Sequence, residues 1–154
     1  MGFNTASGCK ISIGTTTSAT TQAEYEADSY TEIGTIEDLG EFGDSFNAVT
    51  FTSLADSRVN KRKGAADAGD MTLSVAFDGA DSGQQALKVA LDDTGALPYN
   101  FKVELNDSLG TSPTTFYFSA MVMSRRTQVG SSDNVVKAAV QLGITTAVIE
   151  VAAA

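Results

Sequence analysis

The chain has 154 residues, a formal net charge of −9, one cysteine and no histidine. This length suits a single domain with its own hydrophobic core, and no apolar run is long enough to cross a bilayer. Without histidine, the commonest general base and zinc ligand are missing. We find no complete catalytic motif, so we predict a protein that is not an enzyme and holds no cofactor or metal.

The lone Cys9 has no partner for a disulfide within the chain. The first ten residues also lack the apolar stretch of a secretory signal. Both observations favour synthesis in a reducing cytoplasm.

The first third of the chain combines one clear strand with polar and acidic stretches. Residues 9–14 have the composition of a short strand, whereas the threonine-rich residues 15–21 predict a flexible loop or arm. Residues 22–44 are acidic and interrupted by glycines, and part of them, near 30–37, suits a strand. We therefore expect a first strand at 9–14 and a second near 30–37, with irregular polar segments around them.

The middle of the chain holds a strand followed by an unusual polar segment. Residues 46–52 alternate as a strand, and residues 53–69 are polar, with small residues at their end. If the strand 46–52 pairs with a strand that begins at residue 70, then 53–69 is a hairpin loop far longer than the usual 2–5 residues. Loops of that length in compact domains are functional or disordered.

Charge is distributed unevenly over this region. Nine acids and no base occur from Glu24 to Asp56, and four of the ten bases then fall within six residues. These four bases are Arg58, Lys61, Arg62 and Lys63. One interpretation is a solvated surface that keeps the protein soluble. The other is a pair of complementary patches on different ends of one subunit, suited to head-to-tail contact between copies.

The segment 69–93 predicts a strand followed at once by a helix. Met71, Leu73, Val75 and Phe77 alternate with polar residues, which puts them on one face of a strand. The period then changes, because the following apolar residues recur at spacings of three and four and form one stripe on a helix over about 82–92. These residues are Ala86, Leu87, Ala90 and Leu91, with Asp81 and Ser82 as N-cap candidates.

Four further strands follow without a helix between them. They are predicted at residues 98–105, 115–124, 134–144 and 147–151. The strand 134–144 has one wholly apolar face and one face of small and polar residues. Consecutive strands without helical crossovers predict a mainly β fold: an antiparallel sandwich or partial barrel with one flanking α-helix.

The order of these pieces resembles the tail tube protein, or major tail protein, of long-tailed lambda-like phages. The resemblance covers about residues 33–151. Its most specific part is 69–91, where Gly-Asp opens the strand GDMTLSVAFD and Gly-Gln-Gln-Ala-Leu opens the helix. A second part is 118–140, where a strand, a polar turn and another strand follow in the expected order.

The resemblance implies a structural protein of the virion tail. Members of this family form hexameric rings, in which the inner sheets of neighbouring copies join into one β-barrel. The rings stack into a hollow tube through which DNA passes without specific binding. The expected partners are further copies of the chain and other tail proteins, such as tape measure and tail-end proteins, and no membrane is involved.

In such a tube, acidic walls would repel passing DNA, whereas basic walls would bind its phosphates. The candidates for a lumen or ring-stacking face are the acids Glu37, Asp38, Glu41 and Asp44. We expect the four clustered bases Arg58, Lys61, Arg62 and Lys63 to contact acids of an adjacent subunit or ring.

Two alternatives remain open at this stage. The tube protein of a bacterial contractile secretion system shares the same architecture. A soluble β-sandwich binding module is the other alternative, although such a module would be expected to show a secretory signal and exposed aromatic residues at one end.

Overall fold

The computed structural model describes residues 3–154. Two helices are present in this part of the chain, α1 (Gln22–Glu26) and α2 (Ser82–Asp92). The strands are β1 (Lys10–Ile13), β2 (Thr31–Glu32), β3 (Ile36–Asp38), β4 (Ser45–Thr52), β5 (Val59–Asp67), β6 (Asp70–Ala76), β7 (Tyr99–Glu104), β8 (Thr115–Gln128), β9 (Lys137–Ile144) and β10 (Ile149–Val151). None of the helices described is both long enough and apolar enough to span a membrane.

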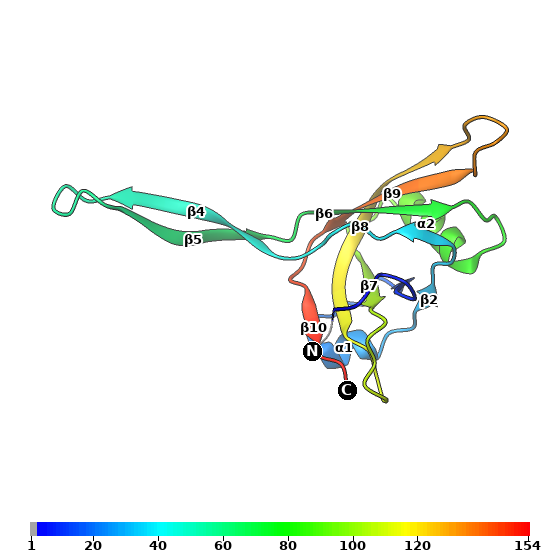
Figure 1. The fold of residues 1–154 in the computed structure, drawn as a ribbon, viewed down its shortest axis with the longest axis horizontal. Coiled ribbons are helices and arrows are strands. Elements are labelled where there is room, and N and C mark those ends of the chain that lie inside the picture. The colour runs from blue at the N-terminus through cyan, green and yellow to red at the C-terminus, as the bar shows by residue number, and fades with distance from the viewer. Residues whose placement is uncertain (1–2) are drawn as a thin grey trace.

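Eight strands form one antiparallel sheet in the order β2-β1-β7-β8-β9-β6-β3, with β10 added beside β8. The strand β8 has 14 residues and connects the two halves of the sheet, because it pairs with β7 through its first part and with β9 through its second. Figure 1 shows the curved β8 passing between these halves. The mainly β, antiparallel architecture is as expected, and within residues 3–154 the sheet does not close into a barrel, because its end strands do not pair with each other.

One face of this curled sheet encloses the main hydrophobic core. The alternating residues Leu73 of β6, Phe118 of β8 and Val140 of β9 are fully buried there. The helix α2 covers this core with its apolar stripe, from which Leu87 is fully buried and Ala90 nearly so. The alternation and the helical stripe therefore mark the buried faces of β6 and α2, except that Phe77 lies beyond the end of β6 and is 44% exposed.

The start of α2 explains the residues Gly-Gln-Gln that open this helix. Asp81 caps the helix, because its carboxylate accepts hydrogen bonds from the backbone N–H groups of Gln84 (2.9 Å) and Gly34 (3.0 Å). A Cβ at Gly83 would lie 2.2 Å from the carbonyl oxygen of Glu32, so only glycine allows this approach. The helix therefore begins in direct backbone contact with β2.

The buried side chain of Gln84 fastens the segment before β3 to the helix. Its amide nitrogen donates to the Thr35 hydroxyl (2.9 Å) and to the carbonyl oxygens of Ala76 (2.9 Å) and Gly34 (3.2 Å). Its oxygen accepts from the backbone N–H of Asp78 at 3.0 Å. All hydrogen-bonding atoms of this amide are occupied within the protein, which fixes the position at which β3 joins the sheet.

The N-terminal segment 15–21 is irregular, as expected for a loop, but it is attached to the body. Asn100 donates to the carbonyl oxygen of Thr17 at 2.8 Å, and Ala19 is buried. The short helix α1 follows directly, was not predicted, and buries Tyr25. Five residues are too short to show a helical period, which explains why the pattern did not reveal this helix.

The expected long loop at 53–69 is wrong. The strand β4 pairs with β5, not with β6, so that only residues 53–58 form the loop between them. The strand β5 has no buried side, and its residues are exposed apart from the half-buried Gly64. Its sequence therefore lacks the apolar alternation by which a half-buried strand is recognised.

Candidate assembly surfaces

The hairpin of β4 and β5, residues 45–67, projects from the body as a long arm (Figure 1). Every residue of β4 is exposed. The two strands pair from Thr52 with Val59 near the tip to Ser45 with Asp67 at the base, with an irregularity between Phe46 and Ala48. Because an isolated two-stranded hairpin is only marginally stable in water, an arm of this kind needs a surface to pack on.

Each face of the arm carries both apolar and basic side chains. Directly paired residues share a face of a hairpin, so Val49 lies beside Arg62 and Phe51 beside Asn60 on one face. The opposite face carries Phe46, Ala48, Thr50, Lys61 and Lys63. On that face, the ammonium group of Lys63 lies 4.7 Å from the centre of the Phe46 ring.

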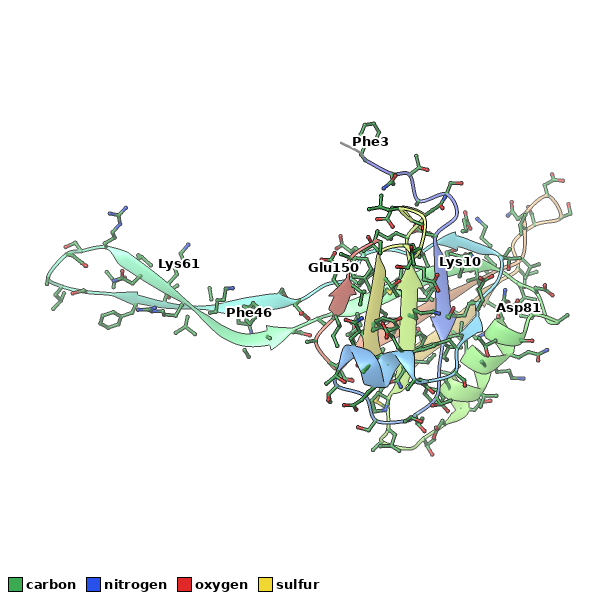
Figure 2. All side chains as sticks on the ribbon, turned by 90° about the horizontal axis from the view of Figure 1, so that it is seen from below. Phe3, Lys10, Phe46, Lys61, Asp81 and Glu150 are labelled. Carbon is green, nitrogen blue, oxygen red and sulfur yellow. The ribbon has the colours of Figure 1, made fainter. Side chains whose placement is uncertain are left out.

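The apolar side chains of the arm are strongly exposed. Phe51 is 69% exposed, Phe46 is 50% exposed and Leu54 at the tip is completely exposed. Figure 2 shows Lys61 far along the arm and Phe46 nearer to its base. Grouped exposed apolar residues of this kind mark an interaction surface. The sequence pattern showed the alternation of residues 46–52 but gave no sign that both faces lack a cover within the chain.

The structure brings the four predicted basic residues together on the arm. Arg58 ends the loop at the tip, where its backbone N–H donates to the Asp56 carboxylate at 3.1 Å. Lys61, Arg62 and Lys63 lie in β5 and divide between its two faces. The ion pairs found within residues 3–154 involve none of the four. Their contact with acids of another copy stays a prediction.

The second candidate surface is the sheet face opposite the core, over β6, β9 and the second part of β8. We call it the open face. Most of its residues on β6 and β9 are small or polar and include Thr72, Ser74, Ala139, Gln141 and Gly143, whereas β8 adds Met121 and Met123 beside Gly143. Gln141 donates to the carboxylate of Asp70 at 3.1 Å across this face. The mixed face that the sequence predicted for 134–144 is therefore part of a larger, mainly polar surface.

The four predicted acids separate into two groups. Glu37 and Asp38 lie in the edge strand β3, where Glu37 forms an ion pair with Lys137 at 2.9 Å and Asp38 accepts from the backbone N–H of Gly40 at 2.7 Å. Glu41 and Asp44 instead line a hollow at the base of the arm. The first group borders the open face, and the second lies where the arm leaves the body.

Two strand edges of the sheet are left unpaired around the open face. The strand β7 pairs with β8 only as far as Ala120, so residues 121–128 have β9 on one side and no strand of the described chain on the other. At the opposite end, β3 has three residues and pairs only with β6. Unpaired edges offer backbone N–H and C=O groups to a further chain.

A buried polar cluster lies under the N-terminal segment, and sequence reasoning did not find it. The hydroxyl of Tyr25 lies 3.0 Å from that of Ser119, which in turn donates to Asn100 at 2.8 Å. Asn100 also donates to Asp28 at 2.9 Å. Burial alone would raise the pKa of Asp28, but hydrogen bonds from Thr15, Asn100 and the backbone hold it below its ordinary value.

This cluster is structural in character. The ring of Tyr117 stacks on Tyr25 with centroids 5.7 Å apart, and burial raises the pKa of the Tyr117 phenol. Within residues 3–154, all buried side-chain nitrogen and oxygen atoms have hydrogen-bond partners. The cluster therefore joins α1 and the N-terminal segment to the sheet.

No protein-family model and no curated protein matches the sequence. Solved structures do match. A chain from the sheath/tube terminator of the extracellular contractile injection system PVC, in its extended state, superposes with a TM-score of 0.73 at 13% identity, covering 99% of both chains. The chain shares the fold of tail and injection-tube assemblies.

Two tail structures give the same result. A chain from the tail of an empty GTA particle, refined with C6 symmetry, has a TM-score of 0.67 at 14% identity and covers 97% of this chain and 100% of that one. The SPP1 tail tube has a TM-score of 0.65 at 12% identity, covering 92% of this chain and 75% of the other. The fold expected from the tail-tube resemblance is confirmed.

Proposed function

We propose that this chain is a structural protein of a phage tail, whose copies assemble into stacked hexameric rings that form a hollow tube for DNA. The observation that carries the proposal is the full-length match to a tail chain, which covers 97% of this chain and 100% of that one. The structure refined there has six-fold symmetry, which supports the hexameric ring. The protein would be made in the host cytoplasm and would reside in the virion tail.

The arm supports self-assembly. Its exposed apolar residues need a cover, and its basic residues need acidic partners, which a second copy with a net charge of −9 provides. In the proposed tube, the arm packs on an adjacent subunit or ring, with Arg58, Lys61, Arg62 and Lys63 facing acids such as Glu41 and Asp44. Burial of its aromatic rings would supply the attraction, and the charges would supply the orientation.

The open face supports the role of a tube wall. It is mainly polar while the opposite face is core, as expected of a barrel wall with water on one side. Copies that join through their free strand edges would close the sheet into a ring. DNA would then pass over a mainly polar surface that carries both acids and bases, without specific binding. Other tail proteins, such as tape measure and tail-end proteins, are the further partners proposed.

A tube protein of a contractile injection system is the second candidate. It is favoured by the TM-score of 0.73 and the 99% coverage of both chains in the comparison with the PVC terminator. The two candidates differ in their partners, since a contractile system adds a sheath outside the tube. Mass spectrometry of native particles that contain this chain would separate them, because a sheath protein in equal copy number favours the second candidate.

Negative-stain electron microscopy of the purified protein tests the proposal. We expect hollow tubes with a regular ring repeat from the wild type. Replacing Arg58, Lys61, Arg62 and Lys63 by Ala should abolish tubes and leave the far-UV circular dichroism spectrum and Tm unchanged. A protein with Lys10 and Lys88 replaced by Ala, which loses two exposed bases of the body, is the control.

The outcomes bear on different parts of the proposal. A wild-type protein that stays monomeric at high concentration would contradict the tube. Normal tubes from the variant without the four basic residues would contradict the role of the arm's charge while leaving the tube intact.

A further inference from the structure

One cross-strand row of the open face begins at a base and ends at an acid. Arg126 of β8 pairs with Ala139 of β9, which pairs with Ser74 of β6, which pairs with Asp38 of β3. Directly paired residues of antiparallel strands lie side by side on the same face. The row therefore spans the four strands from one free edge of the sheet to the other.

The two charges at the ends of this row have no ion-pair partner within residues 3–154. The ion pairs found there involve Lys10, Lys102 and Lys137, so Arg126 is exposed without a carboxylate. Asp38 is held only by the backbone N–H of Gly40. Its neighbour Glu37 is already paired with Lys137.

The irregularity in β3 places both acids of this strand at the edge. Ile36 pairs with Val75 and Asp38 with Ser74, so Glu37 and Asp38 together stand opposite Ser74. Consistent with this, the Ser74 hydroxyl donates to the Glu37 carboxylate at 3.3 Å. The β3 edge is thus acidic on the same face on which the β8 edge is basic.

Strand direction permits the two edges to meet. The strands β8, β9, β6 and β3 are each antiparallel to the next. With four alternating strands, β3 runs opposite to β8. When copies are placed around a ring, β8 of one copy therefore meets β3 of the next in the antiparallel sense, and the alternation continues unbroken through every junction.

We propose that the free edge of β8, residues 121–128, pairs with β3 of a second copy, and that Arg126 of one copy forms an ion pair with Asp38 of the next. The proposal rests on the proposed function, because it requires copies that form rings. Pairing covers the backbone groups of both edges, while the ion pair selects the register. A slip of one residue would place the open face of one copy beside the core face of the next.

Charge exchange tests the pair directly. Arg126→Glu and Asp38→Arg should each reduce the fraction of protein that sediments as tubes at least tenfold, because like charges then face each other across the junction. The double variant restores opposite charges and should recover assembly to within about twofold of wild type. Lys88→Glu on α2 makes the same change of charge away from both edges and should assemble normally.

Each outcome either supports or overturns the ion pair between Arg126 and Asp38. Single variants that sediment like wild type would overturn the pair, as would a double variant that remains unassembled while its circular dichroism spectrum is native. In both cases wild-type tubes would still support the proposed function. A wild-type protein that never forms rings would overturn both the function and this junction.

Cross-linking gives a second readout that does not depend on charge. In a Cys9→Ser background, Arg126→Cys combined with Asp38→Cys places one thiol at each edge. Mild oxidation of assembled protein should give a ladder of linked subunits on a non-reducing gel. The matched pair Arg126→Cys and Lys88→Cys should give none, and an absent ladder from the first pair in intact tubes would contradict the junction.

Discussion

The body and the arm use the same kinds of residue in opposite ways. In the body, Phe118 and Leu73 are completely buried between the curled sheet and α2. In the arm, Phe51 and Val49 alternate just as regularly but are 69% and 55% exposed. The body contains its own hydrophobic core, whereas the apolar side chains of the arm have no cover within residues 3–154.

This difference separates folding from assembly. Removing apolar atoms from the body leaves a cavity and loses transfer free energy. Removing them from the arm changes little in the free subunit, because those atoms contact water there. An arm that is covered only by a second copy is stabilised only in the assembly, in proportion to the occupancy of that contact.

The largest expected effect is on the body core. Phe118→Ala should lower the free energy of unfolding by about 3–5 kcal/mol, because it removes a fully buried ring. This ring stacks on Phe101, with centroids 5.8 Å apart, so its loss also leaves Phe101 without that contact. Urea denaturation followed by circular dichroism measures the change. A loss below about 1 kcal/mol would mean that the body is not held together by this core.

The next effect concerns the attachment of β3 to the body. Gln84→Ala should cost about 2–3 kcal/mol, because it removes a buried amide together with its hydrogen bonds to Thr35, Ala76 and Asp78. Gln85→Ala is the matched control, since Gln85 is exposed and donates only to the carbonyl oxygen of Gly79. Equal stability of the two variants in urea denaturation would contradict the role assigned to the Gln84 amide.

The contrast between the buried body and the exposed arm also explains why the sequence predicted the body better than the arm. The strands near 70–77 and 134–144 were predictable because one face of each is buried, which forces apolar residues into every second position. The helix α2 occupies Ser82–Asp92, as its stripe predicted, because that stripe covers the core. In the arm no strand face is buried within the described residues, so β5 carries no such pattern and its sequence predicts a loop.

The sequence predicted which charged residues the candidate surfaces carry, but not where these residues lie in the fold. The clustering of the bases near Arg58 and of the acids near Glu37 is visible in the sequence, but their positions on two faces of an arm and at a strand edge are not. The row from Arg126 to Asp38 depends on the register of three strand pairs and on two irregularities. Register is set by tertiary packing, and hydrophobic periodicity alone does not define it.

A smaller effect is expected where the N-terminal segment is joined to the body. Asp28→Asn should lower the free energy of unfolding by about 1 kcal/mol at pH 7, because its charged hydrogen bonds to Thr15 and Asn100 are weakened. The pKa of Asp28 is lowered in the folded state. Its contribution is therefore complete above the ordinary carboxyl pKa of about 3.9 and is lost as the pH falls through the lower folded value.

The pH dependence distinguishes this carboxylate from a general effect of charge. The difference in stability between wild type and Asp28→Asn should shrink as the pH is lowered from 5 towards 2. Asp92→Asn at the exposed end of α2 should show little difference from wild type at either pH. A gap between wild type and Asp28→Asn that widens at low pH would contradict the assignment.

The smallest effect on stability belongs to the arm, and the same change should have a large effect on assembly. Phe51→Ser should alter the free energy of unfolding of the free subunit by no more than about 0.5 kcal/mol, because the ring is mostly exposed. Leu109→Ser, which alters a 79% exposed residue of the body, is the matched control. Tube formation, measured by sedimentation, should fall severalfold for Phe51→Ser and stay unchanged for Leu109→Ser. If both variants assembled equally well, the exposed rings of the arm would need another explanation than a second copy, whereas a selective loss would show that the arm's apolar residues belong to a core that only the assembly completes.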